Sequence, residues 1–92
     1  MKPYVKIYYN YFHLDICDTP PCEMCGHPAV NIHHIDNKGM GGSKKKDFIG
    51  NLAAVCMECH NKAHRHPEFN EELKKKHLIN VENGDVRIWS FL

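Results

Sequence analysis

Long apolar runs and a strong net charge are missing from this sequence of 92 residues, whose formal net charge is +1 at pH 7. No stretch approaches the roughly 18–20 consecutive apolar residues of a membrane span. The N-terminus also lacks the pattern of a secretory signal peptide. We therefore expect a cytoplasmic protein that contacts no membrane. At this length we expect a single domain over residues 1–92, with a core small enough that a metal or disulfide staple is common.

A disulfide framework is not expected either, because five cysteines are an odd number and no secretory signal accompanies them. Four of them form two C-x-x-C pairs: Cys22 with Cys25, and Cys56 with Cys59. Two such pairs supply the tetrahedron of thiolates that structural zinc prefers, so we predict a four-cysteine zinc site. The alternative is a set of buried thiols or a redox pair. The fifth cysteine, Cys17, is interpreted as a free thiol.

Hydrophobic patterning and turn residues predict an α+β chain. The expected elements are, in order, a strand over 4–12, a strand over 29–35, an exposed loop over 36–50, an apolar segment over 52–55, helices over 56–66 and 68–78, and a strand over 86–92. Asn83 and Gly84 form a typical hairpin-turn pair that introduces the last strand. Separately, this last strand could pair with residues 4–9. Three apolar residues of that strand are expected in the core: Ile88, Trp89 and Phe91.

A second group of residues has the composition of a catalytic metal site. It consists of His33, His34, Asn51, His60 and His64. His60 and His64 are four residues apart, which places both imidazoles on one face of the predicted helix. With a third ligand from the preceding strand they form a facial metal set with open positions. Since neighbouring strand residues point to opposite faces, one of His33 and His34 is expected to bind metal and the other to act as a general base.

These residues, in this order and spacing, resemble the HNH endonuclease family. The resemblance covers about residues 22–66 and includes the variant braced by two zinc-binding C-x-x-C pairs. It rests on residues 32–35 (Ile-His-His-Ile), residues 41–43 (Gly-Gly-Ser), Asn51 with Leu52, residues 55–60 (Val-Cys-Met-Glu-Cys-His) and His64. It implies a small domain of the ββα-metal (His-Me finger) type, in which two strands joined by a long loop precede a helix.

The resemblance implies a metal-dependent endonuclease that hydrolyses DNA and leaves 5′-phosphate and 3′-hydroxyl ends. His34 corresponds to the general base that activates water. His33, His60 and His64 correspond to the ligands of a catalytic Mg²⁺, Mn²⁺, Ni²⁺ or Zn²⁺ ion. His33 stands where many relatives have Asp, a departure shared by the colicin-like branch of the family. Asn51 corresponds to the residue that orients the loop of the base or, in some members, assists the metal.

Basic residues gather in the same part of the chain, where six of them accompany only two acidic residues between positions 38 and 65. They are Lys38, Lys44, Lys45, Lys46, Lys62 and Arg65. Such a group can contact the phosphate backbone of DNA, although a solvated lysine loop is the alternative interpretation. Because the chain has little room for a separate sequence-reading domain, we expect weak or structure-based specificity, or delivery by a protein partner.

Two alternatives to an enzyme stay open. One is a catalytically inactive zinc module that binds nucleic acid or protein through the same scaffold. The other is a zinc-ribbon adaptor, in which the histidines lie on the surface and only one metal is bound. Compact members of the HNH family are carried by phages and other mobile elements. That origin would place this protein in the cytoplasm of a host cell.

Overall fold

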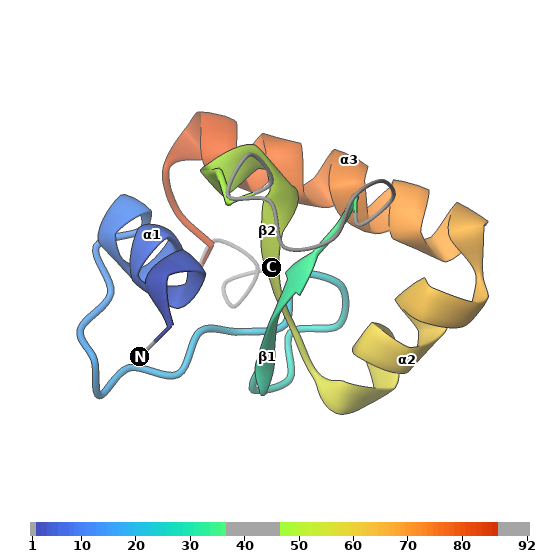
Figure 1. Cartoon of the computed structure of the whole chain (residues 1–92), viewed down its shortest axis with the longest axis horizontal. Helices are drawn as coiled ribbons and strands as arrows, with labels where there is room; N and C mark the ends of the chain where they lie inside the picture. Colours follow the sequence, from blue (N-terminus) through green and yellow to red (C-terminus); the bar gives the residue numbers. More distant parts are fainter. Residues whose placement is uncertain (1, 37–46, 87–92) are drawn as a thin grey trace.

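The computed structural model describes residues 2–36 and 47–86 of the chain. Its elements are α1 (Pro3–Tyr11), β1 (Asn31–His34), the short 3-10 helix η2 (Ile49–Asn51), β2 (Leu52–Val55), α2 (Met57–Arg65) and α3 (Pro67–Asn83). Figure 1 shows the two strands in the middle, with α1 to their left, α2 to their right and α3 across the top. The α+β fold class is therefore confirmed, and β1, β2 and α2 follow one another as the ββα arrangement requires.

The two strands form an antiparallel pair whose second member is buried on both faces. The register places Asn31 opposite Val55 and His34 opposite Leu52. Ala53 and Val55 pack toward Ala63 of α2 and Leu73 of α3, whereas Leu52 and Ala54 pack toward Tyr8 and Phe12 of the N-terminal helix. A strand covered on both sides has no polar face, which explains the uninterrupted apolar sequence of β2.

The prediction of an N-terminal strand over residues 4–12 is wrong, because these residues form α1. Pro3 occupies the first turn of the helix, where its fixed φ and missing N–H cost nothing. Tyr4, Tyr8 and Phe12 recur at intervals of four and therefore share one helical face. Tyr8 and Phe12 are almost completely buried in that face, so the aromatic residues that suggested a strand are the core contacts of a helix.

Helix α3 is longer than predicted and removes the expected hairpin. It runs from Pro67 to Asn83 instead of ending near residue 78. Gly84 adopts a left-handed conformation (φ 73°) and donates its N–H to the Asn80 carbonyl at 2.8 Å. The predicted hairpin turn at residues 83–84 is thus wrong, since Gly84 is a helix C-cap, a place that glycine also favours. Of the expected last strand, residues 87–92 lie outside the described residues, and so do the predicted core positions Ile88, Trp89 and Phe91.

A buried carboxylate joins the first cysteine pair to helices α1 and α3. Glu23 is 1% exposed and accepts four hydrogen bonds. The donors are Tyr8 Oη at 2.8 Å, the Ala54 N–H at 2.9 Å, His77 Nδ1 at 2.7 Å and Asn80 Nδ2 at 2.9 Å. His77 also donates Nε2 to the Ile49 carbonyl, so both of its nitrogens face acceptors. Burial, followed by the charge of Glu23, raises the pKa of Tyr8 far above its ordinary value and keeps it a donor.

Among the helices that the structure describes, none is long and apolar enough to cross a membrane.

Candidate metal centres and active site

The four cysteines of the two C-x-x-C pairs come together at the start of α2. Their sulfur atoms all lie within 4.8 Å of one another, and Cys25 Sγ is 3.6 Å from Cys56 Sγ. Thiolates bound to zinc at about 2.3 Å in a tetrahedron lie about 3.8 Å apart, so the cluster fits the predicted zinc site. Cys56 also caps α2, since its sulfur accepts the Cys59 N–H. Cys17 is an exposed free thiol outside this cluster, as interpreted from the sequence.

A second cluster unites three of the predicted histidines. His33 from β1 and His60 and His64 from α2 each offer one nitrogen, and these atoms lie within 4.8 Å of one another. The two Nε2 atoms of His60 and His64 are 3.0 Å apart. Adjacent ligands at about 2.1 Å from a six-coordinate ion have nearly this separation, so the set can hold a divalent cation.

Two histidines of this second cluster, His33 and His60, have lowered pKa values. Burial, with smaller contributions from the neighbouring imidazoles, lowers the pKa of His33 to about 4. Burial and the charge of His64 also lower the pKa of His60. A neutral imidazole keeps a lone pair for a metal, so the cluster is ready to bind a cation at pH 7 without first releasing protons from these two rings.

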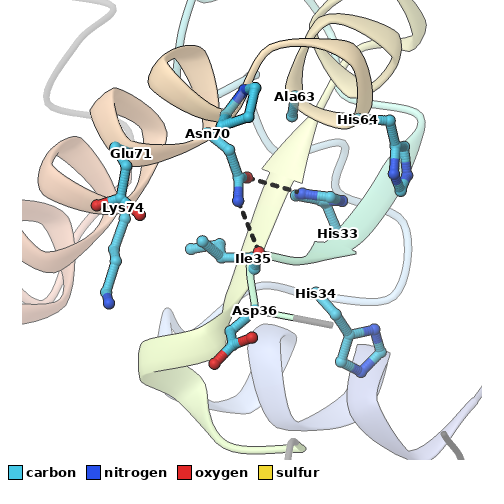
Figure 2. Close-up of a pocket in the computed structure, with 10 residues that line it drawn as sticks. His33, His34, Ile35, Asp36, Ala63, His64, Asn70, Glu71 and Lys74 are labelled. Atoms are coloured by element: carbon cyan, nitrogen blue, oxygen red, sulfur yellow. Dashed lines mark hydrogen bonds between the residues drawn. The ribbon is translucent and has the colours of Figure 1, made fainter. Parts of the chain in front are cut away.

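His34 points away from this cluster and has different partners. Its Nε2 lies 2.7 Å from Asp47 Oδ1, and its ring centroid lies 4.7 Å from that of Tyr4 in α1. Figure 2 shows the rings of His33 and His34 leaving β1 in different directions, as alternation along a strand requires. The structure therefore separates the two adjacent histidines as the sequence predicts.

Asn51 is buried and holds the chain where β1 ends. Its Oδ1 accepts the Asp36 N–H at 2.7 Å, and its Nδ2 donates to the Asp36 carbonyl at 3.1 Å. The Asn51 carbonyl also accepts the Ile35 N–H at 2.9 Å. These bonds fix the segment that directly follows His34, which is the geometry expected of a residue that orients the loop of the base.

Two hollows reach the histidines from different sides. The larger, of about 440 Å³, is shown in Figure 2, and its walls come from β1, α2 and α3. The smaller, of about 210 Å³, is lined by Tyr4 of α1 together with residues of β1 and α2. His33, His34 and His64 line both hollows. A ligand could therefore approach the three-histidine cluster and His34 together.

The basic residues predicted to contact DNA are only partly described. Lys38, Lys44, Lys45 and Lys46 lie outside the described residues. Lys62 and Arg65 are exposed on α2. Lys62 pairs with Glu58 at 3.3 Å, and it lies two residues from both His60 and His64, on the opposite side of the helix. A contact from Lys62 to DNA would therefore fall away from the metal cluster.

Among the described residues, sequence reasoning missed four that contact the predicted histidines: Tyr4, Asp47, Asn70 and Asn31, whose Nδ2 lies 3.5 Å from His60 Nδ1. Tyr4 and Asp47 flank His34, and Asn70 bonds to His33. Each one reaches its histidine from a distant part of the chain, so no local spacing could have marked it. A buried histidine needs a partner for its second nitrogen, and that general requirement was the only available signal.

Comparison with known proteins gives one match. The sequence model of the HNH endonuclease family matches residues 22–66, a segment that contains both cysteine pairs, β1, β2 and α2. Searches of curated proteins and of solved structures found no match. The family match and the four-cysteine cluster agree on the same residues. Residues 22–66 therefore match the HNH endonuclease family, and the four-cysteine cluster is consistent with its zinc-stapled variant, which has two C-x-x-C pairs.

Proposed function

We propose that this protein is a metal-dependent endonuclease that hydrolyses phosphodiester bonds in DNA. The proposal is supported most strongly by one observation, that three histidines converge while His34 is held separately beside them. A structural module would need only the four cysteines to brace its fold. The match of residues 22–66 to the HNH family supports DNA as the substrate and partner.

In this proposal His33, His60 and His64 hold the catalytic cation. Imidazole ligands suit transition metals such as Ni²⁺ and Zn²⁺, and Mg²⁺ and Mn²⁺ are the other candidates. A divalent cation bound there would polarise a phosphate oxygen and stabilise the leaving alkoxide. The four cysteines carry a separate Zn²⁺ ion, whose task is to stabilise the fold.

His34 acts as the general base. An ionised Asp47 carboxylate only accepts hydrogen bonds, so Nε2 of His34 carries the proton and Nδ1 keeps the lone pair. Nδ1 can then take a proton from the attacking water, and Asp47 stabilises the imidazolium that results. Tyr4 packs against the ring and restricts its rotation. Asn51 assists by fixing the chain after His34 through Asp36.

The predicted contacts of Lys38, Lys44, Lys45, Lys46, Lys62 and Arg65 with DNA remain part of this proposal. The cytoplasmic location, the phage or mobile-element origin and a targeting protein partner stay predictions.

Cleavage of supercoiled plasmid tests the proposal. The wild-type protein, loaded with zinc at the cysteines, would be compared with His34→Ala in Mg²⁺, Mn²⁺, Ni²⁺ and Zn²⁺, and in excess EDTA. His66→Ala is a matched control, because His66 is exposed and pairs only with Glu68 among the contacts described. We expect metal-dependent nicking by the wild type and the control, and none by His34→Ala. No cleavage by a folded wild type, on branched and single-stranded DNA as well, would favour the inactive binding module instead.

A further inference from the structure

Asn70 bonds to a proposed metal ligand from outside the segment that matches the family. It lies in the first turns of α3, beyond residue 66. Its Nδ2 donates to the Ile35 carbonyl at 2.7 Å, and its Oδ1 lies 3.1 Å from His33 Nε2. Figure 2 shows both bonds, with the carboxamide between the end of β1 and the His33 ring.

These two bonds determine which nitrogen of His33 carries a proton. A backbone carbonyl only accepts, so the NH₂ group of Asn70 must face Ile35 and its oxygen must face His33. That oxygen also only accepts, so His33 Nε2 must be the donor. His33 is 5% exposed, and an imidazole that binds a cation carries a single proton. The lone pair is then on Nδ1.

We propose that Asn70 is a positioning residue for the metal site: it holds His33 as the Nε2–H tautomer and presents Nδ1 to the cation. This inference rests on the proposed metal site. Metal-binding histidines generally donate their second N–H to an oxygen of the surrounding protein, which fixes the ring and raises its basicity. Asn70 supplies that oxygen. Its second bond ties α3 to Ile35, next to the proposed base His34, so one side chain orients both halves of the site.

The tautomer can be measured without activity and without a catalytic metal. In the protein with zinc only at the cysteines, ¹⁵N–¹H spectra of the histidine rings separate protonated from unprotonated nitrogens. We expect His33 Nε2 to be protonated in the wild type. In Asn70→Ala both tautomers should be populated. Addition of Zn²⁺ at the second site should then shift His33 Nδ1 in the wild type.

Metal affinity measured by calorimetry gives the second readout. Loss of an oxygen partner of a metal-bound histidine typically weakens binding about 10–100-fold. We expect a loss in this range for Asn70→Ala and none for Asn83→Ala, a matched control at the exposed end of the same helix. Asn70→Asp separates two roles of the side chain, because it keeps an acceptor for His33 and loses the donor to Ile35. It should retain the Nε2–H tautomer and at least the wild-type affinity.

Three results would overturn the inference. Equal losses of affinity in Asn70→Ala and Asn70→Asp would reduce Asn70 to an anchor of Ile35. A metal-induced shift at His33 Nε2 would mean that this nitrogen is the ligand and that the Asn70 oxygen lies beside the cation. An unchanged tautomer in Asn70→Ala would mean that Asn70 does not set it. If the tautomer and the affinities behave as expected but DNA is not cleaved, the inference stands and the nuclease proposal fails.

Discussion

Replacement of Glu23 by Gln tests whether a buried ion pair holds the first cysteine pair in place. The substitution keeps the shape of the side chain but removes its charge and turns one of two accepting oxygens into a donor. That donor would face Tyr8 and Ala54 on one side, or His77 and Asn80 on the other. Either orientation places the new N–H group opposite an existing donor, the Ala54 N–H on one side or Asn80 Nδ2 on the other.

Breaking a buried ion pair by removing one partner costs about 3–5 kcal/mol. We therefore expect the free energy of unfolding to fall by about 3 kcal/mol, a large share of the total stability of roughly 5–15 kcal/mol for a small domain.

Urea denaturation of the zinc-loaded protein at pH 7, followed by circular dichroism, measures this loss. Glu72→Gln is the matched control, since Glu72 is exposed on α3 and pairs only with Lys75, at 3.7 Å, among the contacts described. An exposed pair of this kind contributes less than about 1 kcal/mol. If Glu23→Gln were no more destabilising than Glu72→Gln, the four hydrogen bonds to Glu23 would not stabilise the fold.

Two further predictions concern the metal centres. Cys22→Ser should lower bound zinc and the cooperativity of unfolding, whereas Cys17→Ser should change neither, as measured by the zinc-to-protein ratio and thermal denaturation. The second concerns His33, whose pKa of about 4 in the folded state compares with about 6.5 in the unfolded chain. Below pH 6.5 the unfolded state therefore binds more protons, and stability falls as the pH falls toward 4, by about 2 kcal/mol at pH 5. Urea denaturation at pH 7 and pH 5 should show this extra loss in the wild type but not in His33→Gln; equal losses would contradict the assigned shift.

The two clusters of potential metal ligands could be predicted because their geometry is local. A C-x-x-C pair fixes two sulfurs within one turn, and an interval of four residues fixes His60 and His64 on one face of α2. The remaining ligand, His33, follows from the strand before the loop and from alternation along that strand. These rules do not depend on how the rest of the chain folds.

Both wrong predictions came from sequence patterns that are compatible with two different secondary structures. Aromatic residues are frequent in strands, but Tyr4, Tyr8 and Phe12 are also spaced for a helix that begins at Pro3. An Asn-Gly pair fits a hairpin turn and equally a helix C-terminus, and α3 extends far enough for Gly84 to be its cap. In both cases the packing against β2 and Glu23 selects one of the two secondary structures, and no local sequence pattern describes that packing.

Contacts between distant residues explain how so small a domain can keep its two clusters of potential metal ligands in a fixed relative position. Cys56 and Cys59 fix the first turn of α2, and His60 follows directly, so a zinc ion on the cysteines would also orient the helix that carries the proposed ligands His60 and His64. On the other side, α3 binds Glu23 through His77 and reaches His33 through Asn70.

Both halves of the histidine cluster are therefore attached to the four-cysteine cluster, one half through Cys56 and Cys59 at the start of α2 and the other through α3 and Glu23. A core of this size cannot fix the positions of the histidines by apolar packing alone. The zinc site and the buried polar network around Glu23 fix these positions instead. For this reason we expect substitutions at Glu23 or Cys22 to weaken metal binding at His33, His60 and His64, although neither residue is a member of that cluster.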